Sequence, residues 1–191
     1  MSTDNAKKKK KKSSKKGGVL REIISISIYL LSILLLTYLL VTFVVQRIVV
    51  QGESMESTLS DGDNLLVDKI TYRFHEPKRF DIVVFPYAYE KNTFYIKRVI
   101  GLPGETVFIS NSGEIFINDE PLTENYGSAV MTDPGLAGNS VYLASNEYFV
   151  LGDNRNHSAD SRDPSIGPVK RDKIIGRAWM RMWPFRKRGK L

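Results

Sequence analysis

The chain has 191 residues, enough for one domain of ordinary size with appendages, and its 42% hydrophobic and 26% charged residues exclude wholesale disorder. It contains no cysteine, which excludes a disulfide-stapled fold, a zinc ribbon, an iron–sulfur protein and a cysteine nucleophile. The formal charge is +7, but residues 1–21 hold nine Lys or Arg and one Asp, which leaves the remaining 170 residues at −1. The basic character belongs to a tail, so the body of the chain does not have the charge of a nucleic-acid-binding domain.

The N-terminal quarter predicts a tail followed by a membrane anchor. Residues 1–21 are lysine-rich and lack apolar periodicity, so we expect a disordered segment. Residues 23–45 carry no formal charge, and a helix of that length spans about 35 Å, enough for a hydrocarbon core of about 30 Å. A cleavable signal peptide is the alternative, but its apolar part is usually about 7–15 residues long and a small-residue cleavage site follows it, which is missing here.

We therefore expect an uncleaved anchor helix over residues 22–46. The lysines precede the anchor and only Arg47 follows it closely, so the positive-inside rule predicts a cytoplasmic tail and an extracytoplasmic remainder.

Residues 47–185 read as a mostly β domain, which we expect to be an antiparallel, barrel-like sheet structure. Short runs rich in Val, Ile, Phe and Tyr alternate with turn signals, and Asn111-Ser112-Gly113 predicts a hairpin. The predicted strands cover residues 48–50, 65–67, 81–85, 94–100, 106–109, 114–117, 141–143, 148–151 and 174–180. A long loop over 126–140 interrupts them, and residues 186–191 form a basic tail that we expect to fray.

No motif for a metal ion, nucleotide or other cofactor is present, so we expect none. The two histidines, His75 and His157, have no metal-ligand spacing, and neither a phosphate loop nor a G-x-G-x-x-G string occurs. Without cysteine, a nucleophile must be Ser, Thr, Lys or a carboxylate.

Three local strings are candidates for chemistry. G-E-S-M-E-S-T over residues 52–58 follows the anchor, Y-I-K-R-V-I-G-L-P-G over 95–104 puts a lysine into an apolar strand, and G-D-N-R-N-H-S-A-D-S-R over 152–162 is a dense polar loop. Each string alone has an ordinary structural interpretation as a turn, a solvent-facing strand residue or a scaffold loop. Strand alternation, however, sends Lys97 and Arg98 to opposite faces, so one of these cations must point into an apolar layer unless both faces are exposed. Such a conflict between charge and pattern is typical of a functional site.

Taken together and in this order behind an anchor, the three strings resemble the type I signal peptidases, in the compact single-anchor form of Gram-positive bacteria. The resemblance implies a membrane-bound serine protease that removes signal peptides with Ser54 as nucleophile and Lys97 as general base. It implies supporting roles for four residues of the last string: Asp153, Ser158, Asp160 and Arg162. In relatives that have a serine two residues before the nucleophile, the hydroxyl of that serine helps to stabilise the oxyanion. Gly52 stands there in this chain, so a backbone N–H must serve.

The resemblance also implies a substrate and partners. The substrate is an extended segment with small residues at the first and third positions before the cut, bound along Val50, Gly52 and Ile96 as an added strand. The expected partners are signal peptides of exported preproteins, lipids of the cytoplasmic membrane and the protein translocation machinery, with no nucleic acid. For Lys97 to act as a base its pKa must fall from about 10.4, because otherwise only about one lysine in a thousand is neutral at pH 7.4.

Three other functions remain open from the residues. A Ser–His–Asp protease would use His157, an inactive homologue would bind extended peptides without cleaving them, and a self-cleaving repressor would share the Ser–Lys chemistry. The repressor predicts a cytoplasmic DNA-binding half, and the apolar anchor occupies that place instead.

Overall fold

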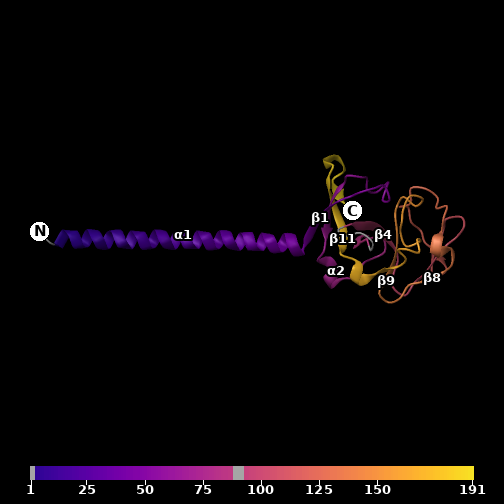
Figure 1. Ribbon diagram of the computed structural model, residues 1–191, viewed down its shortest axis with the longest axis horizontal. Helices are drawn as coiled ribbons and strands as arrows, with labels where there is room; N and C mark the ends of the chain where they lie inside the picture. Colours follow the sequence, from indigo (N-terminus) through magenta and orange to yellow (C-terminus); the bar gives the residue numbers. More distant parts are fainter. Residues whose placement is uncertain (1–2, 88–92) are drawn as a thin grey trace. The chain divides into compact units, whose positions relative to one another are not determined.

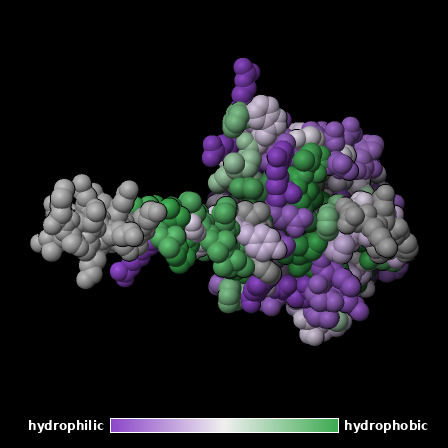
Figure 2. Space-filling model, turned by 60° about the vertical axis from the view of Figure 1, so that its left-hand side comes forward, coloured by the Kyte–Doolittle hydropathy of each residue, from purple (hydrophilic) through white to green (hydrophobic). Residues whose placement is uncertain are grey.

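The computed structural model describes residues 3–87 and 93–191, and the chain divides into an N-terminal helix and a folded body that begins at Val44 (Figure 1). The helix, α1, spans Thr3–Phe43. Its segment Gly18–Leu40 is long and apolar enough to cross a membrane, and this part has none of its residues buried. Its side chains form a hydrophobic outer surface (Figure 2), as expected of a helix whose solvent is lipid.

The helix differs from the expected boundaries at both ends. It reaches back through the lysine run, where we expected disorder, and it ends at Phe43, three residues before the expected end of the anchor. Alanine and lysine are good helix formers, and a helix already nucleated by the apolar segment extends at little further entropic cost.

The body is built on an eight-stranded antiparallel sheet in the order β1-β2-β11-β3-β4-β9-β10, with β12 paired to β11 (Figure 1). β1 lies at the edge of this sheet and β4 near its middle, between β3 and β9. The strands of this sheet are β1 Val45–Val49, β2 Asn64–Asp68, β3 Ile82–Pro86, β4 Phe94–Gly101, β9 Glu147–Leu151, β10 Val169–Lys170, β11 Gly176–Trp183 and β12 Gly189–Lys190.

A second sheet of four strands has the order β7-β6-β5-β8. Its strands are β5 Thr106–Ile109, β6 Ile115–Ile117, β7 Glu120–Pro121 and β8 Val141–Tyr142. The predicted hairpin connects β5 to β6, and Gly113 has the positive φ of 83° that this turn needs. The described residues of the body also form four short helical turns: α2 Thr71–Phe74, η1 Gly135–Gly138, η2 Arg171–Lys173 and η3 Phe185–Lys187.

The mostly β, antiparallel fold class is confirmed, and each predicted strand has a counterpart within a few residues. The sequence pattern missed β7, β10 and β12, which have two residues each and too little length for an alternation to be read. Residues 186–191 do not fray as expected, because Lys190 pairs with Met180 and the Leu191 amide donates to the Trp179 carbonyl at 3.0 Å.

The two sheets meet at the end of β4, which carries both the candidate base and a glycine against the second sheet. A Cβ at Gly101 would lie 2.5 Å from Cγ2 of Val107, 2.7 Å from Cδ1 of Leu143 and 3.0 Å from Cβ of Phe149. These three side chains belong to a fully buried cluster, so they have no room to move away.

We therefore predict that Gly101→Ala overpacks the contact between the sheets and destabilises the body by about 1–3 kcal/mol. Gly189→Ala is the matched control, because nothing lies within 4 Å of its added Cβ. Thermal unfolding in detergent should show a lower Tm for Gly101→Ala and an unchanged Tm for Gly189→Ala. Equal Tm values for the two variants would contradict the close packing.

Candidate active site

Ser54 lies in a tight turn that follows β1. The turn starts at Gly52, whose φ is +84° and whose amide donates to Oδ1 of Asp61 at 2.8 Å. Met55 and Leu59 are 1% and 0% exposed, and they fix the turn to the core beneath it. The Leu59 amide donates to the Met55 carbonyl at 2.8 Å, which closes the turn. The hydroxyl of Ser54 is thereby held at the surface of a rigid loop.

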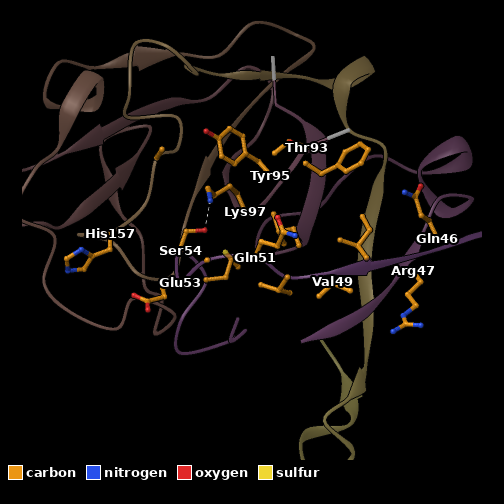
Figure 3. A pocket seen from close by; sticks show the side chains of 17 residues that line it. Gln46, Arg47, Val49, Gln51, Glu53, Ser54, Thr93, Tyr95, Lys97 and His157 are labelled. Atoms are coloured by element: carbon orange, nitrogen blue, oxygen red, sulfur yellow. Dashed lines mark hydrogen bonds between the residues drawn. The ribbon is translucent and has the colours of Figure 1, made fainter. Parts of the chain in front are cut away.

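Lys97 reaches this hydroxyl from the middle of β4. Its Nζ is 2.6 Å from Oγ of Ser54, although the two residues are 43 positions apart in the sequence (Figure 3). The side chain is 2% exposed, and Nζ also lies 5.1 Å from the ring centroid of Tyr95. The arrangement therefore places a buried amine within hydrogen-bonding distance of a hydroxyl.

Burial lowers the pKa of Lys97 from 10.5 to about 8. Desolvation of the ammonium is the largest cause, and the charge of Arg162 acts in the same direction. The carboxylates of Asp160 and Asp153 oppose it and raise the pKa. Desolvation prevails because taking a charged amine out of water outweighs the attraction of partly neutralised neighbours.

Lys97 and Arg98, the two adjacent cations of β4, are both buried. A cationic side chain therefore points into the protein interior on each face of this strand. Arg98 is 4% exposed and donates to Asp153 from Nε at 2.8 Å and from Nη2 at 2.6 Å. Its guanidinium also lies 3.7 Å from the ring centroid of Tyr126. The third sequence string pointed to Asp153 but to neither of these partners. Strand alternation pointed to Arg98, whereas nothing near Tyr126 in the sequence pointed to that ring.

The loop over residues 152–162 is hydrogen-bonded to the backbone of the Ser54 turn. The Asn154 amide donates to the Ser54 carbonyl at 3.1 Å, and its side chain donates to the Glu53 carbonyl at 3.2 Å. A Cβ at Gly152 would lie 2.4 Å from that Ser54 carbonyl, so only glycine allows this approach. Asp160 accepts from the Gly152 amide at 3.1 Å and forms an ion pair with Arg162 at 2.8 Å, which fixes the loop.

Ser158, for which the resemblance implies a supporting role, does not form a hydrogen bond to Lys97 among the described residues. Within the part of the chain that the structure describes, its Oγ is buried and has no hydrogen-bond partner. A Cβ at Gly152 would lie 2.2 Å from this Oγ, which shows how closely the two residues pack beside the Ser54 turn. A role for Ser158 in orienting the amine stays a prediction. Arg155, to which no sequence signal pointed, is 3% exposed and pairs with Glu124 at 2.7 Å.

A cleft of about 570 Å³ runs past the Ser54–Lys97 pair (Figure 3). Two chain segments line it, residues 46–55 and 93–97, together with His157 and Ala159. The three residues expected to bind substrate, Val50, Gly52 and Ile96, all lie on this cleft. His157 lies at its margin, and no hydrogen bond among the described residues joins its side chain to Ser54. Within the described residues, no group of three or more His, Asp or Glu could hold a metal ion.

Comparisons with known proteins identify the family of the chain. A sequence model of the family described as signal peptidase, peptidase S26, matches residues 21–183. The chain is 44% identical over 146 residues to signal peptidase I of Leptolyngbya laminosa, a match covering 73% of this chain and 69% of that one. It is 42% identical over 143 residues to a probable signal peptidase I-2 of Synechocystis, covering 72% of this chain and 63% of the relative, slightly less than two thirds of its length.

A crystal structure of a signal peptidase I from Enterococcus faecalis V583 is 35% identical and aligns with a TM-score of 0.45, covering 54% of this chain and 97% of that one. Family match and sequence identity together establish that the chain belongs to the signal peptidase family, peptidase S26, and is a serine endopeptidase of the signal peptidase I type.

Proposed function

We propose that this enzyme cleaves signal peptides from preproteins with a Ser54–Lys97 dyad. The observation that carries the proposal is the 2.6 Å separation of Nζ and Oγ at an amine that is shielded from water. With a pKa of about 8, about one Lys97 in five is neutral at pH 7.4, against about one in a thousand for an ordinary lysine. A neutral amine is what proton abstraction from a serine requires.

In the proposed cycle, neutral Lys97 takes the proton of the Ser54 hydroxyl as Oγ attacks the scissile carbonyl carbon. The negative charge that develops on the carbonyl oxygen is stabilised by the Ser54 backbone N–H and a neighbouring donor, since Gly52 has no side chain to offer. Lys97 then gives its proton to the leaving amine, which completes an acyl-enzyme on Ser54. A water molecule, deprotonated by Lys97, hydrolyses this ester and frees the enzyme.

The shape of the cleft supports an extended substrate. β1 is an edge strand and its residues line the cleft, so a peptide can bind along its unpaired edge as an additional strand. Val50 and Ile96 are 4% and 8% exposed and form a shallow apolar wall, while Gly52 leaves space beside the nucleophile. Such a surface favours small side chains at the first and third positions before the cut.

The supporting residues would act through the loop they fix. Asp153 holds Arg98 on the far side of β4, and the Asp160–Arg162 pair keeps the 152–162 loop against the carbonyl of Ser54. We assign all three, together with Ser158, to positioning of the dyad.

We further propose that α1 anchors the body at the outer face of the cytoplasmic membrane. The lysine-rich residues 1–21 precede the apolar segment, so the positive-inside rule retains them in the cytoplasm. Residues 22–46 then serve as the anchor, residues 47–185 as the extracytoplasmic protease domain and residues 186–191 as its basic end. Ser54 follows Val45 by nine residues, a reach of at most about 30 Å from the bilayer, where a signal peptide emerging from the translocation machinery presents its cleavage site.

The dyad is tested by cleavage of a precursor whose signal peptide ends in Ala-x-Ala. We expect Ser54→Ala and Lys97→Met to abolish processing in detergent and His157→Ala to retain it. Activity that survives Lys97→Met and is lost in His157→Ala would favour the Ser–His–Asp alternative. Substrate binding without any cleavage by the unaltered chain would favour a peptide-binding homologue.

The pH dependence of kcat/KM provides a second test. The base must be neutral, so activity should rise about tenfold per pH unit below pH 8 and level off above it. His157→Ala should show the same profile. A rise centred near pH 6.5, the ordinary range of histidine, and absent from His157→Ala would assign the base to His157 instead.

The buried amine also predicts an unusual stability effect. The pKa of Lys97 is about 8 in the folded chain and about 10.5 in the unfolded chain. Between pH 8 and pH 10.5 the unfolded chain therefore binds more protons than the folded chain. The free energy of unfolding consequently increases as the pH rises through this range. Below pH 8 the burial costs about 3 kcal/mol. Lys97→Met should therefore raise the Tm at pH 7 and raise it far less at pH 10.5.

Ser54→Ala, which keeps the amine, is the control for this experiment and should not show the pH-dependent gain. A Tm at pH 7 lower in Lys97→Met than in the unaltered chain would contradict the desolvation of Lys97.

A further inference from the structure

Among the described residues of the body, the most exposed large hydrophobic side chain lies in the short turn over residues 69–75. Phe74 of α2 is 76% exposed, and Ile70, four positions earlier, is 37% exposed. Residues four apart share one face of a helix, so these two side chains form a single apolar face. Tyr72 is 6% exposed and points to the opposite side, into the core.

This exposure does not come from a loosely held loop. Oδ1 of Asp68 accepts from the amides of Ile70 and Thr71 at 3.0 Å each, which fixes the start of the turn. The buried Tyr72 donates from its hydroxyl to Asp81 at 2.8 Å. Arg171 donates to the Tyr72 carbonyl and forms an ion pair with Glu76 at 2.6 Å, which fixes the end. A rigid turn therefore presents Phe74 to the outside.

The turn lies beside the point at which the chain leaves its apolar helix. The Lys69 amide donates to the carbonyl of Val44 at 2.9 Å, and Val45 pairs with Asp68 in the sheet. Val44 directly follows Phe43, the last residue of α1. The path from Val44 across to Lys69 and along the turn to Phe74 has the length of about two extended and four helical residues. Phe74 therefore lies within about 15 Å of Val44. This proximity holds whatever direction the helix takes from Val44.

The charges around the turn match an anionic lipid surface. Lys69 and Arg73 are four positions apart and each directly precedes a member of the apolar face, and Lys78 follows. The two acidic residues that flank the turn each have partners, Asp68 the amides of the turn and Glu76 the side chain of Arg171. Apolar side chains flanked by cations are the composition that binds at a membrane interface.

We propose that residues 69–75 form an interfacial turn, in which Ile70 and Phe74 insert into the outer leaflet of the anchoring membrane between anionic lipid headgroups. The proposal rests on the membrane anchoring proposed above. It gives the body a second attachment beside its covalent tether. Because Asp68 pairs with Val45 and β1 borders the cleft, this attachment would fix the height of the cleft above the bilayer.

The absence of cysteine from the sequence makes a labelling test direct. Phe74→Cys in the full chain is labelled with an environment-sensitive fluorophore and reconstituted into phosphatidylglycerol–phosphatidylcholine vesicles. Nitroxide lipids labelled near the headgroup serve as quenchers, since interfacial side chains lie about 5–10 Å deep. Tyr142→Cys, at a residue 68% exposed on the second sheet, is the matched control.

We expect blue-shifted, quenched emission from position 74 and unquenched emission from position 142. Replacing Lys69 and Arg73 by glutamine should weaken the contact by about fivefold per charge removed, seen as a loss of quenching. No quenching at position 74, or equal quenching at both positions, would overturn the proposal.

Activity separates this proposal from the proposed function. Phe74→Ser, an exposed substitution, should cleave a short Ala-x-Ala peptide in detergent at the unaltered rate and process a membrane-embedded precursor in vesicles more slowly. Unchanged processing in vesicles would overturn the interfacial turn while leaving the protease intact. Failure of the unaltered chain to cleave the peptide would instead remove the proposed function, and the quenching result would still decide the membrane contact.

Discussion

The structure depends on one unfavourable burial, the amine of Lys97 inside an antiparallel sheet. An ammonium in that position is destabilising, and the chain tolerates it because β4 is held on both sides by β3 and β9. The same burial is what makes a lysine useful, since its pKa of about 8 supplies a base at neutral pH without a histidine. Stability is thus lost at the residue where reactivity is gained, as is usual at sites that depend on pKa perturbation.

The neighbouring polar network is arranged so that it does not reverse this effect. Two carboxylates lie close enough to raise the pKa of Lys97, and each is paired with its own arginine, Asp153 with Arg98 and Asp160 with Arg162. Paired carboxylates attract the amine less than free ones would. The same two ion pairs fix the 152–162 loop against the Ser54 turn, so charge neutralisation and positioning are performed by the same residues.

The sequence predicted most of the strands because one face of each strand is buried, and this burial produces an alternating pattern of hydrophobic residues. The sequence also identified Lys97 as a candidate functional residue, because a cation within an apolar strand violates the hydrophobic pattern. It could not predict contacts between distant segments: the ring of Tyr126 over Arg98, the Glu124–Arg155 pair and the approach of Gly152 to Ser54 each join residues separated by many positions. The two-residue strands lacked a readable period, and the helical extension through the lysines depends on the apolar segment that follows them.

The most direct test of the account is the titration of Lys97 itself. The full chain, labelled with ¹³C and ¹⁵N on lysine and held in detergent, would be followed by NMR from pH 6 to 12, with Lys97→Met used to assign the signal. Burial of the amine predicts a lysine resonance with a midpoint near pH 8 that is missing from Lys97→Met, well below the reference lysine pKa of about 10.4. A Lys97 signal with its midpoint near the reference value of about 10.4 would contradict the claim that burial makes this amine a base.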